Sequence, residues 1–320
     1  TESTKYVATD CFVHTANTVI QCKTTRGIGP SHKVVVRASG HKSALSELTI
    51  GYASPTINRI YSDVGDIEAL PTSGNIAVYI NGTNFPVTDG EAQLAVTYGA
   101  TGTEFAAKNC RVSFPGKSLL CVTTEGYGAG PHRWKVEIDG VASPLSEDTS
   151  SHKAPAITHL RGPGAMESNT RGGEVIFLHG SGLFGTVINV TYGPSGKEYS
   201  ATYCEVVSAH AVVKCLSAEG TGSNHLYSIA VNGLESESLF RSPSGYAPPT
   251  LNNVLGTGAI NALSGGGEQV HLVGTNFGPM SSKSTVNATY TDTHEGLTYS
   301  ANRCVRTVDH TQITCYTSAG

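Results

Sequence analysis

Eight cysteines, arranged as four evenly spaced pairs, constrain this 320-residue chain more than any other feature. The two members of every pair lie 11 residues apart, and the first cysteines of successive pairs are 99, 94 and 100 residues apart. A period near 100 residues matches the size of one immunoglobulin-like β-sandwich. The spacing therefore predicts an internal repeat with one cysteine pair in each copy. The pairs are Cys11/Cys22, Cys110/Cys121, Cys204/Cys215 and Cys304/Cys315.

Other motifs recur in the same phase as the cysteines. Each full repeat opens with a Pro-containing extended segment, followed by a Gly-led strand of alternating apolar residues, a Gly/Asn turn and a strand ending in Val-Thr-Tyr or Ala-Thr-Tyr. The cysteine pair comes next, and a last strand closes the unit. The closing strands are predicted at 32–36, 132–138 and 225–231.

These landmarks divide the chain into four parts. We expect the back half of one repeat at 1–50, whole repeats at 51–151 and 152–244, and the front half of another repeat at 245–320. The links are short and contain Pro and Ser but no long flexible tract. The prediction is an all-β array of tandem sandwiches in which neighbours touch and form a semi-rigid rod.

The order of the motifs resembles the IPT/TIG family of immunoglobulin-like domains. The resemblance lies in Pro-x-Ile, then Gly-Gly-x-Val-x-Leu-x-Gly-x-Asn-Phe-Gly, then Val-x-Tyr-Gly, then Cys-x-Val…Ile-x-Cys, and it covers essentially the whole chain. It implies an early-set immunoglobulin-like sandwich. Members occur in plexin-like receptors, other cell-surface proteins, transcription factors and some polysaccharide-acting enzymes, so the resemblance leaves the function open.

The cysteine pairs have two interpretations, a metal site or a disulfide. Metal sites usually show close spacings such as Cys-x-x-Cys together with His, which ten intervening residues do not match. Each interval instead has the pattern of a hairpin, and the midpoint of Cys110–Cys121 falls between Pro115 and Gly116, which suit a turn. We therefore predict four disulfides within hairpins and an oxidising compartment.

Charge and hydropathy exclude several classes of partner. The net charge of −4 and the isoelectric point near 6.3 provide no basic surface for nucleic acid. No apolar run approaches the roughly 20 residues of a membrane span. The first residues, Thr1–Tyr6, do not have the pattern of a signal peptide and lack an initiator Met. We expect a mature product or a window of a longer chain.

Three Asn-x-Ser/Thr sequons begin at Asn81, Asn189 and Asn287. Asn189 and Asn287 occupy the same position of their repeats, whereas Ala95 takes that position in the second repeat. We expect N-glycans at Asn189 and Asn287, and less strongly at Asn81. The other interpretation is an unmodified strand Asn.

Gly180-Ser181-Gly182-Leu183-Phe184-Gly185 matches the dinucleotide-binding pattern, which requires a helix after it. The following residues, 186–191, have the pattern of a strand, and the sister repeats place Asn84 and Asn276 where Gly182 lies. Since Gly and Asn both tolerate a left-handed backbone, we predict a tight turn with positive φ.

No catalytic constellation is recognisable in the sequence. His32, His132 and His225 share one repeat position, but no nucleophile or carboxylate recurs beside them, so we predict strand-entry residues bonded to backbone. Asp63, Asp66 and Glu68 offer oxygens for Ca²⁺, but no sister repeat shares them, and a solvated loop is preferred. We expect no enzyme activity, no cofactor and no metal.

Two function classes remain. The first is an extracellular structural glycoprotein that forms or belongs to a filament, such as a surface hair, sheath or adhesive fibre. The alternative is the ectodomain of a receptor or adhesin that binds a protein or glycan. The half-repeats predict that missing strands come from further repeats of the same polypeptide or from another copy. Residues 4–27 and 297–320 both contain a cysteine hairpin, so joining the end of one copy to the start of another would supply that hairpin twice. Further repeats of the same polypeptide are therefore the favoured source.

Overall fold

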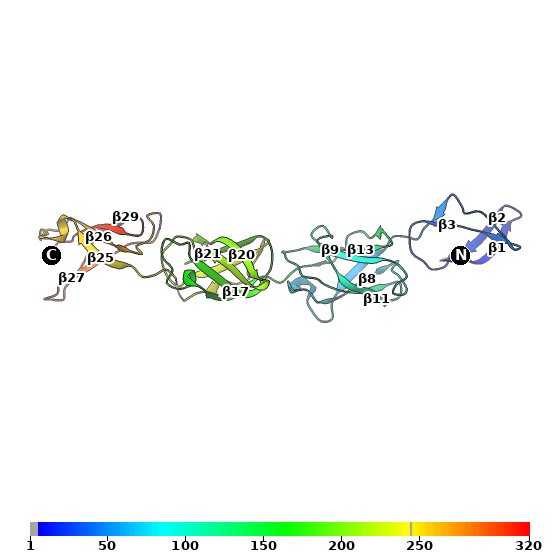
Figure 1. Cartoon of the computed structure of the whole chain (residues 1–320), viewed down its shortest axis with the longest axis horizontal. Helices are drawn as coiled ribbons and strands as arrows, with labels where there is room; N and C mark the ends of the chain where they lie inside the picture. Colours follow the sequence, from blue (N-terminus) through cyan, green and yellow to red (C-terminus); the bar gives the residue numbers. More distant parts are fainter. Residues whose placement is uncertain (1–5, 244) are drawn as a thin grey trace. The chain divides into compact units, whose positions relative to one another are not determined.

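A computed structural model describes residues 6–243 and 245–320 (Figure 1). The start of the first predicted repeat, residues 1–5, and the last residue of the third, Ser244, lie outside the described residues. The chain divides into two compact units, Thr1–Gly126 with Gly130–Lys153, and Tyr127–Ala129 with Ala154–Gly320. The described residues form β-strands and three short 3₁₀ turns, without an α-helix.

The second repeat consists of two antiparallel sheets. The first sheet contains, in spatial order, β11 (Lys108–Phe114), β12 (Ser118–Val122), β8 (Ala77–Thr83) and β7 (Thr56–Tyr61). The second contains β10 (Phe105–Ala106), β9 (Leu94–Gly99), β13 (His132–Ile138) and β14 (Val141–Ala142), with β15 (Thr149–Ser150) also paired to β13. The 3₁₀ turn η1 (Ile67–Ala69) connects β7 to β8.

The third repeat has the same topology. Its first sheet contains β16 (Ala156–Arg161), β17 (Val175–Leu183), β21 (His210–Leu216) and β20 (Thr202–Ser208). Its second sheet contains β19 (Tyr199–Ser200), β18 (Ile188–Gly193), β22 (Leu226–Val231) and β23 (Leu234–Glu235), with β24 (Phe240–Arg241) also paired to β22. The turn η2 (Pro163–Ala165) matches η1.

Alternating burial along the strands creates the sandwich core. In β13, Trp134, Val136 and Ile138 are buried while the residues between them are more exposed, as expected for one face of a sheet. They pack with Val78 and Leu119 of the opposite sheet in one cluster. Two antiparallel sheets closed over a shared apolar core make the second and third repeats immunoglobulin-like β-sandwiches.

The first and fourth repeats each show part of this arrangement. The described part of the first contains three pairs: β1 (Thr9–Thr15) with β2 (Val19–Lys23), β3 (His32–Lys33) with β6 (Thr49–Ile50), and β4 (Arg37–Ala38) with β5 (His41–Lys42). The fourth contains a complete first sheet, β25 (Thr250–Leu255), β26 (Gln269–Thr275), β30 (Gln312–Tyr316) and β29 (Asn302–Val308). Of its second sheet it contains β27 (Thr289–Thr291) and β28 (Thr298–Ser300), and η3 (Thr257–Ala259) matches η1.

The predicted Gly/Asn turn is confirmed. Asn84, Gly182 and Asn276 have φ values of 61°, 70° and 60°, in the left-handed region. The strand β18 follows Gly182, where a dinucleotide site would need a helix. The glycine two residues before the turn is required for a different reason. A Cβ at Gly82 or Gly274 would lie 1.9 Å from the carbonyl oxygen of the neighbouring strand.

All eight cysteines form disulfides, each within its own hairpin. The bonds are Cys11–Cys22, Cys110–Cys121, Cys204–Cys215 and Cys304–Cys315, with Cα atoms 4.1 Å apart in every pair. So short a Cα separation places the two cysteines directly opposite each other on neighbouring strands.

An aromatic residue near each predicted repeat boundary contacts the preceding repeat. Tyr52 and Tyr246 donate backbone hydrogen bonds of 2.9 Å to Gly29 and Gly222 of the preceding repeat. His152 contacts His132 of the second repeat through its side chain, with its Nδ1 3.0 Å from His132 Nε2. The aromatic residue at this position thus contacts the end of the repeat that precedes it.

Candidate functional site

The fourth repeat exposes the apolar face that is internal in the second and third. Tyr290 is 41% exposed, whereas the equivalent residues Tyr98 and Tyr192 are 0% and 2% exposed. In the described residues, the buried core cluster of the fourth repeat consists only of Phe277, Ile313 and Cys315. In residues 6–243 and 245–320, β27 pairs only with β28, whereas β9 and β18 also pair with β13 and β22.

In the closed repeats one strand covers this face. The ring of Trp134 stacks on Tyr98 at 4.3 Å between centroids, and Tyr227 stacks on Tyr192 at 4.8 Å. Each large apolar side chain buried in this way contributes roughly 1.5–3 kcal/mol. Burial also raises the pKa of Tyr227 well above its ordinary value. Among the described residues, Tyr290 stacks on Tyr299 at 5.5 Å between centroids, but no ring equivalent to Trp134 or Tyr227 covers it.

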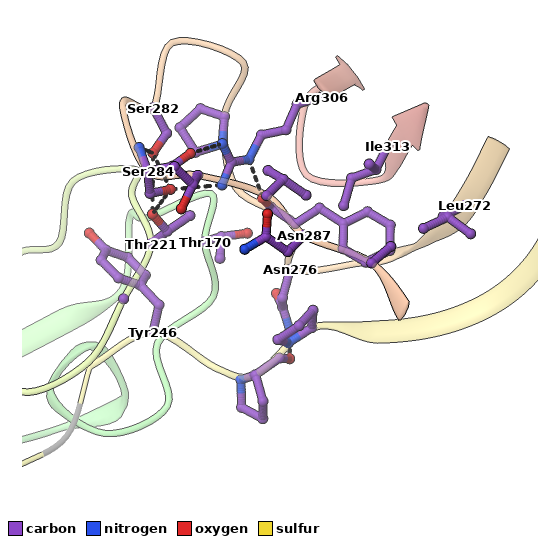
Figure 2. A pocket seen from close by; sticks show the side chains of 18 of the residues that line it. Thr170, Thr221, Tyr246, Leu272, Asn276, Ser282, Ser284, Asn287, Arg306 and Ile313 are labelled. Carbon is purple, nitrogen blue, oxygen red and sulfur yellow. Dashed lines mark hydrogen bonds between the residues drawn. The ribbon is translucent and has the colours of Figure 1, made fainter. Parts of the chain in front are cut away.

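The uncovered face forms one wall of a groove of about 1850 Å³ (Figure 2). Its floor is apolar and contains Leu272, Ile313 and Ala288, and it continues to Tyr246 and neighbouring loops of the third repeat. A contiguous apolar surface of this kind usually marks a site of interaction. The strands that flank it suit another extended segment rather than a small polar ligand.

A polar cluster forms the rim of the groove. Arg306 donates to the backbone oxygen and the hydroxyl of Ser284 at 2.9 and 2.8 Å, and also to the carbonyl oxygen of Phe277. The Ser284 hydroxyl lies 3.0 Å from the Thr221 hydroxyl of the third repeat (Figure 2). These bonds fix the loop of the fourth repeat that carries Ser284.

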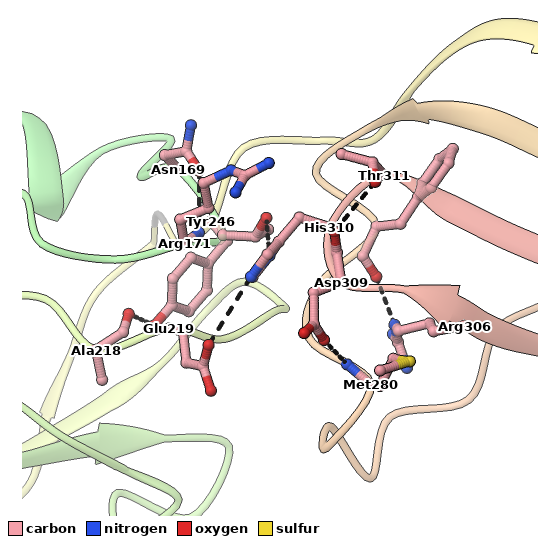
Figure 3. A network of polar contacts seen from close by, with 12 residues as sticks. Asn169, Arg171, Ala218, Glu219, Tyr246, Met280, Arg306, Asp309, His310 and Thr311 are labelled. Carbon is pink, nitrogen blue, oxygen red and sulfur yellow. Dashed lines mark hydrogen bonds and ion pairs between the residues drawn. The ribbon is translucent and has the colours of Figure 1, made fainter.

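His310 forms a second contact between the third and fourth repeats (Figure 3). Its Nδ1 lies 3.0 Å from the Thr170 hydroxyl, and its Nε2 lies 3.8 Å from a carboxylate oxygen of Glu219. His310 is 6% exposed and has a φ of 62° in the β29–β30 turn. A Cβ at the nearby Gly278 would lie 2.0 Å from a Thr221 methyl carbon, so the two surfaces fit closely.

Residues 32–50, called here the closing segment, have the fold of the strands that close the second repeat. The Val34 N–H donates to the Ser46 hydroxyl at 2.9 Å, as Trp134 donates to Ser146 at 2.9 Å. Val34 is nevertheless 39% exposed, whereas Trp134 is fully buried. The closing segment is thus formed but covers no partner face in the described residues.

The three sequons lie in two different environments. Asn189 and Asn287 are exposed, and the residues after them, Val190 and Ala288, face the core. Asn81 is half-buried on β8, whose two edges are paired with β7 and β12. Asn189 and Asn287 therefore meet the geometric requirement for glycan attachment better than Asn81.

The histidines of the shared repeat position lie in clusters of aromatic rings. The prediction that all three bond to the backbone is therefore only partly correct. His32 does contact the Ile28 carbonyl oxygen at 2.9 Å, but His132 Nε2 contacts His152 Nδ1 at 3.0 Å. His225 is 1% exposed among tyrosines, with Tyr246 at 5.6 Å between ring centroids. Burial lowers the pKa of His225. The sequence could not indicate which rings surround these histidines, because the rings come from segments that are distant in the sequence.

Asp66 accepts a hydrogen bond of 2.8 Å from the Glu68 N–H and caps η1. Within residues 6–243 and 245–320, no group of three or more His, Cys, Asp or Glu side chains is placed to hold a metal ion. The same residues contain no helix with the length and apolar character of a membrane span.

No protein-family model matches the sequence, and no curated protein sequence matches it. Three solved structures are similar in part. FdeC, an adhesin of Escherichia coli, is 10% identical with a TM-score of 0.28, and the match covers 83% of this chain and 88% of FdeC. SGBP-B, from a xyloglucan utilization locus of Bacteroides uniformis, is 15% identical with a TM-score of 0.24 over 82% and 86% of the two chains. Invasin, a bacterial integrin-binding protein, is 11% identical with a TM-score of 0.28 over 83% and 55%. At these TM-scores the similarities carry no argument about function, and the IPT/TIG resemblance stays a prediction.

Proposed function

We propose that this chain is an extracellular structural glycoprotein of the IPT/TIG type, whose tandem sandwiches form or belong to a filament. The recurrence of one disulfide-bonded sandwich topology along the chain carries this proposal. The second and third repeats are closed sandwiches of the same topology, and the fourth contains the same first sheet. Tandem units of one kind that contact their neighbours, as the third and fourth repeats do through His310 and Thr170, stack into an extended array.

The disulfides and the sequons support an extracellular location. Four disulfides, one in each hairpin, persist in an oxidising compartment. Asn189 and Asn287 are exposed on equivalent strand positions, so glycans there would repeat along the array. We assign no catalytic activity, because the recurring histidines are packing residues.

Electron microscopy of the native material tests this proposal. The expected result is long fibres in which sandwich-sized beads follow one another, with glycan mass at the Asn189 and Asn287 positions. Discrete particles that remain monomeric at high protein concentration would show that the structural assignment is wrong. Mass spectrometry of peptides containing the two asparagines tests the glycan part separately.

The alternative, a receptor or adhesin ectodomain, is favoured by one surface of the second repeat. Tyr61 and Tyr79 stack at 5.1 Å between centroids on the outer face of the β7–β8 pair. The guanidinium carbon of Arg59 lies 5.5 Å from the Tyr61 ring. Flat aromatic surfaces beside a cation suit sugar rings or the side chains of a partner protein.

Glycan and protein binding assays distinguish the two functions. If the outer face binds a ligand, Tyr79→Ala abolishes binding and Tyr203→Ala, which changes an exposed tyrosine of the third repeat, leaves it intact. Equal binding by both variants, or none by the unmodified chain, argues for the structural function.

A further inference from the structure

We infer that the first sugar of an N-glycan on Asn81 packs against Tyr79 and Tyr61, so that the outer face of the second repeat holds the chain's own glycan. The inference rests on the proposed function, because it requires that the chain is an extracellular glycoprotein. It assigns a role to the one sequon that lies in a different environment from Asn189 and Asn287.

The pairing registers place Asn81 and the two tyrosines on one face of the first sheet. Tyr61 pairs with Tyr79, and Arg59 pairs with Asn81 in the adjacent row. Tyr79 and Asn81 are two residues apart on β8, so their side chains point to the same side of the sheet. Ile80, which lies between them, is completely buried in the core, so the tyrosines and Asn81 point away from the core.

The tyrosine pair offers the kind of surface on which a sugar packs. The rings of Tyr61 and Tyr79 stack at 5.1 Å between centroids, and both residues are half-buried, so part of each ring faces solvent. A sugar ring has apolar C–H groups that pack against aromatic carbons, while the phenol hydroxyls can bond to its oxygens. Two residues of a strand span about 6.6 Å, so a sugar linked to the Asn81 amide lies within reach of Tyr79.

Polar groups beside the rings match the oxygens of a sugar. The guanidinium carbon of Arg59 lies 5.5 Å from the centroid of the Tyr61 ring. In the described parts of the chain, neither this guanidinium nor the hydroxyls of Tyr61 and Tyr79 donate to a protein acceptor. These donors are therefore available to the hydroxyl and carbonyl oxygens of the sugar.

The sequon and the tyrosine pair occur together in the second repeat and are both absent from these positions of the third and fourth. The equivalents of Asn81 are His179 and Val273, those of Tyr79 are Phe177 and His271, and those of Tyr61 are Arg161 and Leu255. The second repeat in turn has Ala95 where the other two sequons lie. A glycan that packs on neighbouring rings accounts for the joint change, because its acceptor and its platform must lie on the same face.

The sequon at Asn189 has no such platform. Val187 and Thr191, two residues away on either side, and Ala230 opposite carry no aromatic ring. A glycan on Asn189 therefore projects from aliphatic and small polar side chains. This site provides an internal control for Asn81.

Thermal unfolding of the full chain, secreted by a eukaryotic host that attaches N-acetylglucosamine first, tests the contact. Asn81→Gln should lower the melting temperature of the second repeat by several degrees when Tyr79 is present, and by much less in the Tyr79→Thr variant. Asn189→Gln, the matched control, should leave the melting temperature of the third repeat nearly unchanged. An equal loss from Asn81→Gln in both backgrounds overturns the inference.

The same variants made by a host that adds no glycans separate the effect of the sugar from that of the amide. Without glycans, the effects of Asn81→Gln and Tyr79→Thr should be additive. Coupling that persists in these chains would assign the effect to the Asn81 side chain itself and would overturn the inference.

Proton NMR of the glycosylated chain gives a measurement that needs no variant. The ring currents of Tyr61 and Tyr79 should shift the N-acetyl methyl protons of the first sugar on Asn81 upfield from those on Asn189. Equal chemical shifts at the two sites contradict the contact.

Mass spectrometry of the three sequon peptides distinguishes this inference from the proposed function. Glycans at Asn189 and Asn287 together with an unmodified Asn81 would overturn this inference and leave the proposed function standing. Three unmodified asparagines would contradict both, since the proposed function is that of a glycoprotein.

Discussion

The residue immediately before the first cysteine of every pair has a left-handed backbone conformation. Asp10, Asn109, Tyr203 and Arg303 have φ values of 51°, 51°, 50° and 50°. Each lies where the pairing register of the hairpin shifts by one residue, which is the signature of a β-bulge. The bulge brings the following cysteine opposite its partner. Asp and Asn tolerate this conformation, whereas Tyr and Arg give no indication of it in the sequence.

Replacement of Tyr203 by Asn should stabilise the third repeat. The Tyr203 side chain is 84% exposed and loses little packing, while Asn adopts positive φ at lower cost. We expect a gain of about 0.5–1 kcal/mol in the free energy of unfolding, measured by denaturant titration. Tyr203→Ala is the control, since Ala has no preference for this conformation. An equal gain from Ala would show that loss of the exposed ring, not the backbone, is responsible.

Glu198 should make the loop after β18 sensitive to acid. The Ser195 hydroxyl, followed by backbone N–H groups, holds the pKa of Glu198 at about 2, below the ordinary 4.5. The depressed pKa means that this contribution to stability is present above pH 4.5 and is lost as the pH falls towards 2. Ser195→Ala should raise the Glu198 pKa towards 4.5 in an NMR titration. Ser200→Ala, at an exposed site on β19, should leave it unchanged, and a shift with that variant would count against the hydroxyl.

At the scale of elements, the cystine hairpin should contribute differently in closed and open repeats. Removal of Cys204–Cys215 by paired Ala substitutions releases a short loop, which costs roughly 2–3 kcal/mol in the unfolding of the third repeat. Removal of Cys11–Cys22 is the matched comparison, because every residue of β1 and β2 is exposed to solvent and none is buried in a core. For the variant without Cys11–Cys22, chemical denaturation should show no change in the free energy of unfolding of the second repeat. A comparable loss of stability in the second repeat would mean that the hairpin of the first repeat stabilises the second repeat.

Local chemistry made the strands, the hairpins and the turns predictable. The cysteine spacing predicted hairpin disulfides. The occurrence of Asn84 in one repeat and Gly182 at the same position of the next predicted a turn with a left-handed backbone. The surroundings of His225 were not predictable, because Tyr192, Tyr199 and Tyr246 reach it from three separate segments. The groove beside β27 was predicted only as an open half-sandwich. Its polar rim depends on Arg306 and Ser284, which have no recurring counterpart in the motifs.

At the scale of the whole molecule, contacts between successive repeats add to the stability of each sandwich. The first and second repeats touch where Arg26 approaches Gly116, and Ile28 joins the core cluster of the second repeat. Tyr127, which belongs to the same compact unit as the third and fourth repeats, lies 6.1 Å from Phe184 between ring centroids. Ile28, Tyr127 and Thr221 hold the same repeat position. Within each compact unit, this position contacts the following repeat, through apolar Ile28 in the first repeat and polar Thr221 in the third.

His310 should couple the unfolding of the third and fourth repeats. The side chain is buried against Thr170, and one hydrogen bond of this kind contributes about 0.5–1.5 kcal/mol. His310→Asn removes the ring but keeps the turn, because Asn17 occupies the equivalent position of the first repeat with a φ of 63°. Calorimetry of the full chain should then show the fourth repeat melting at a lower temperature than in the unmodified chain, with the transition of the second repeat unchanged. His294→Ala, an exposed histidine of the fourth repeat outside this contact, is the matched control. Identical melting of the His310→Asn variant and the unmodified chain would mean that the two sandwiches unfold independently and that the His310 contact transmits no stability between them.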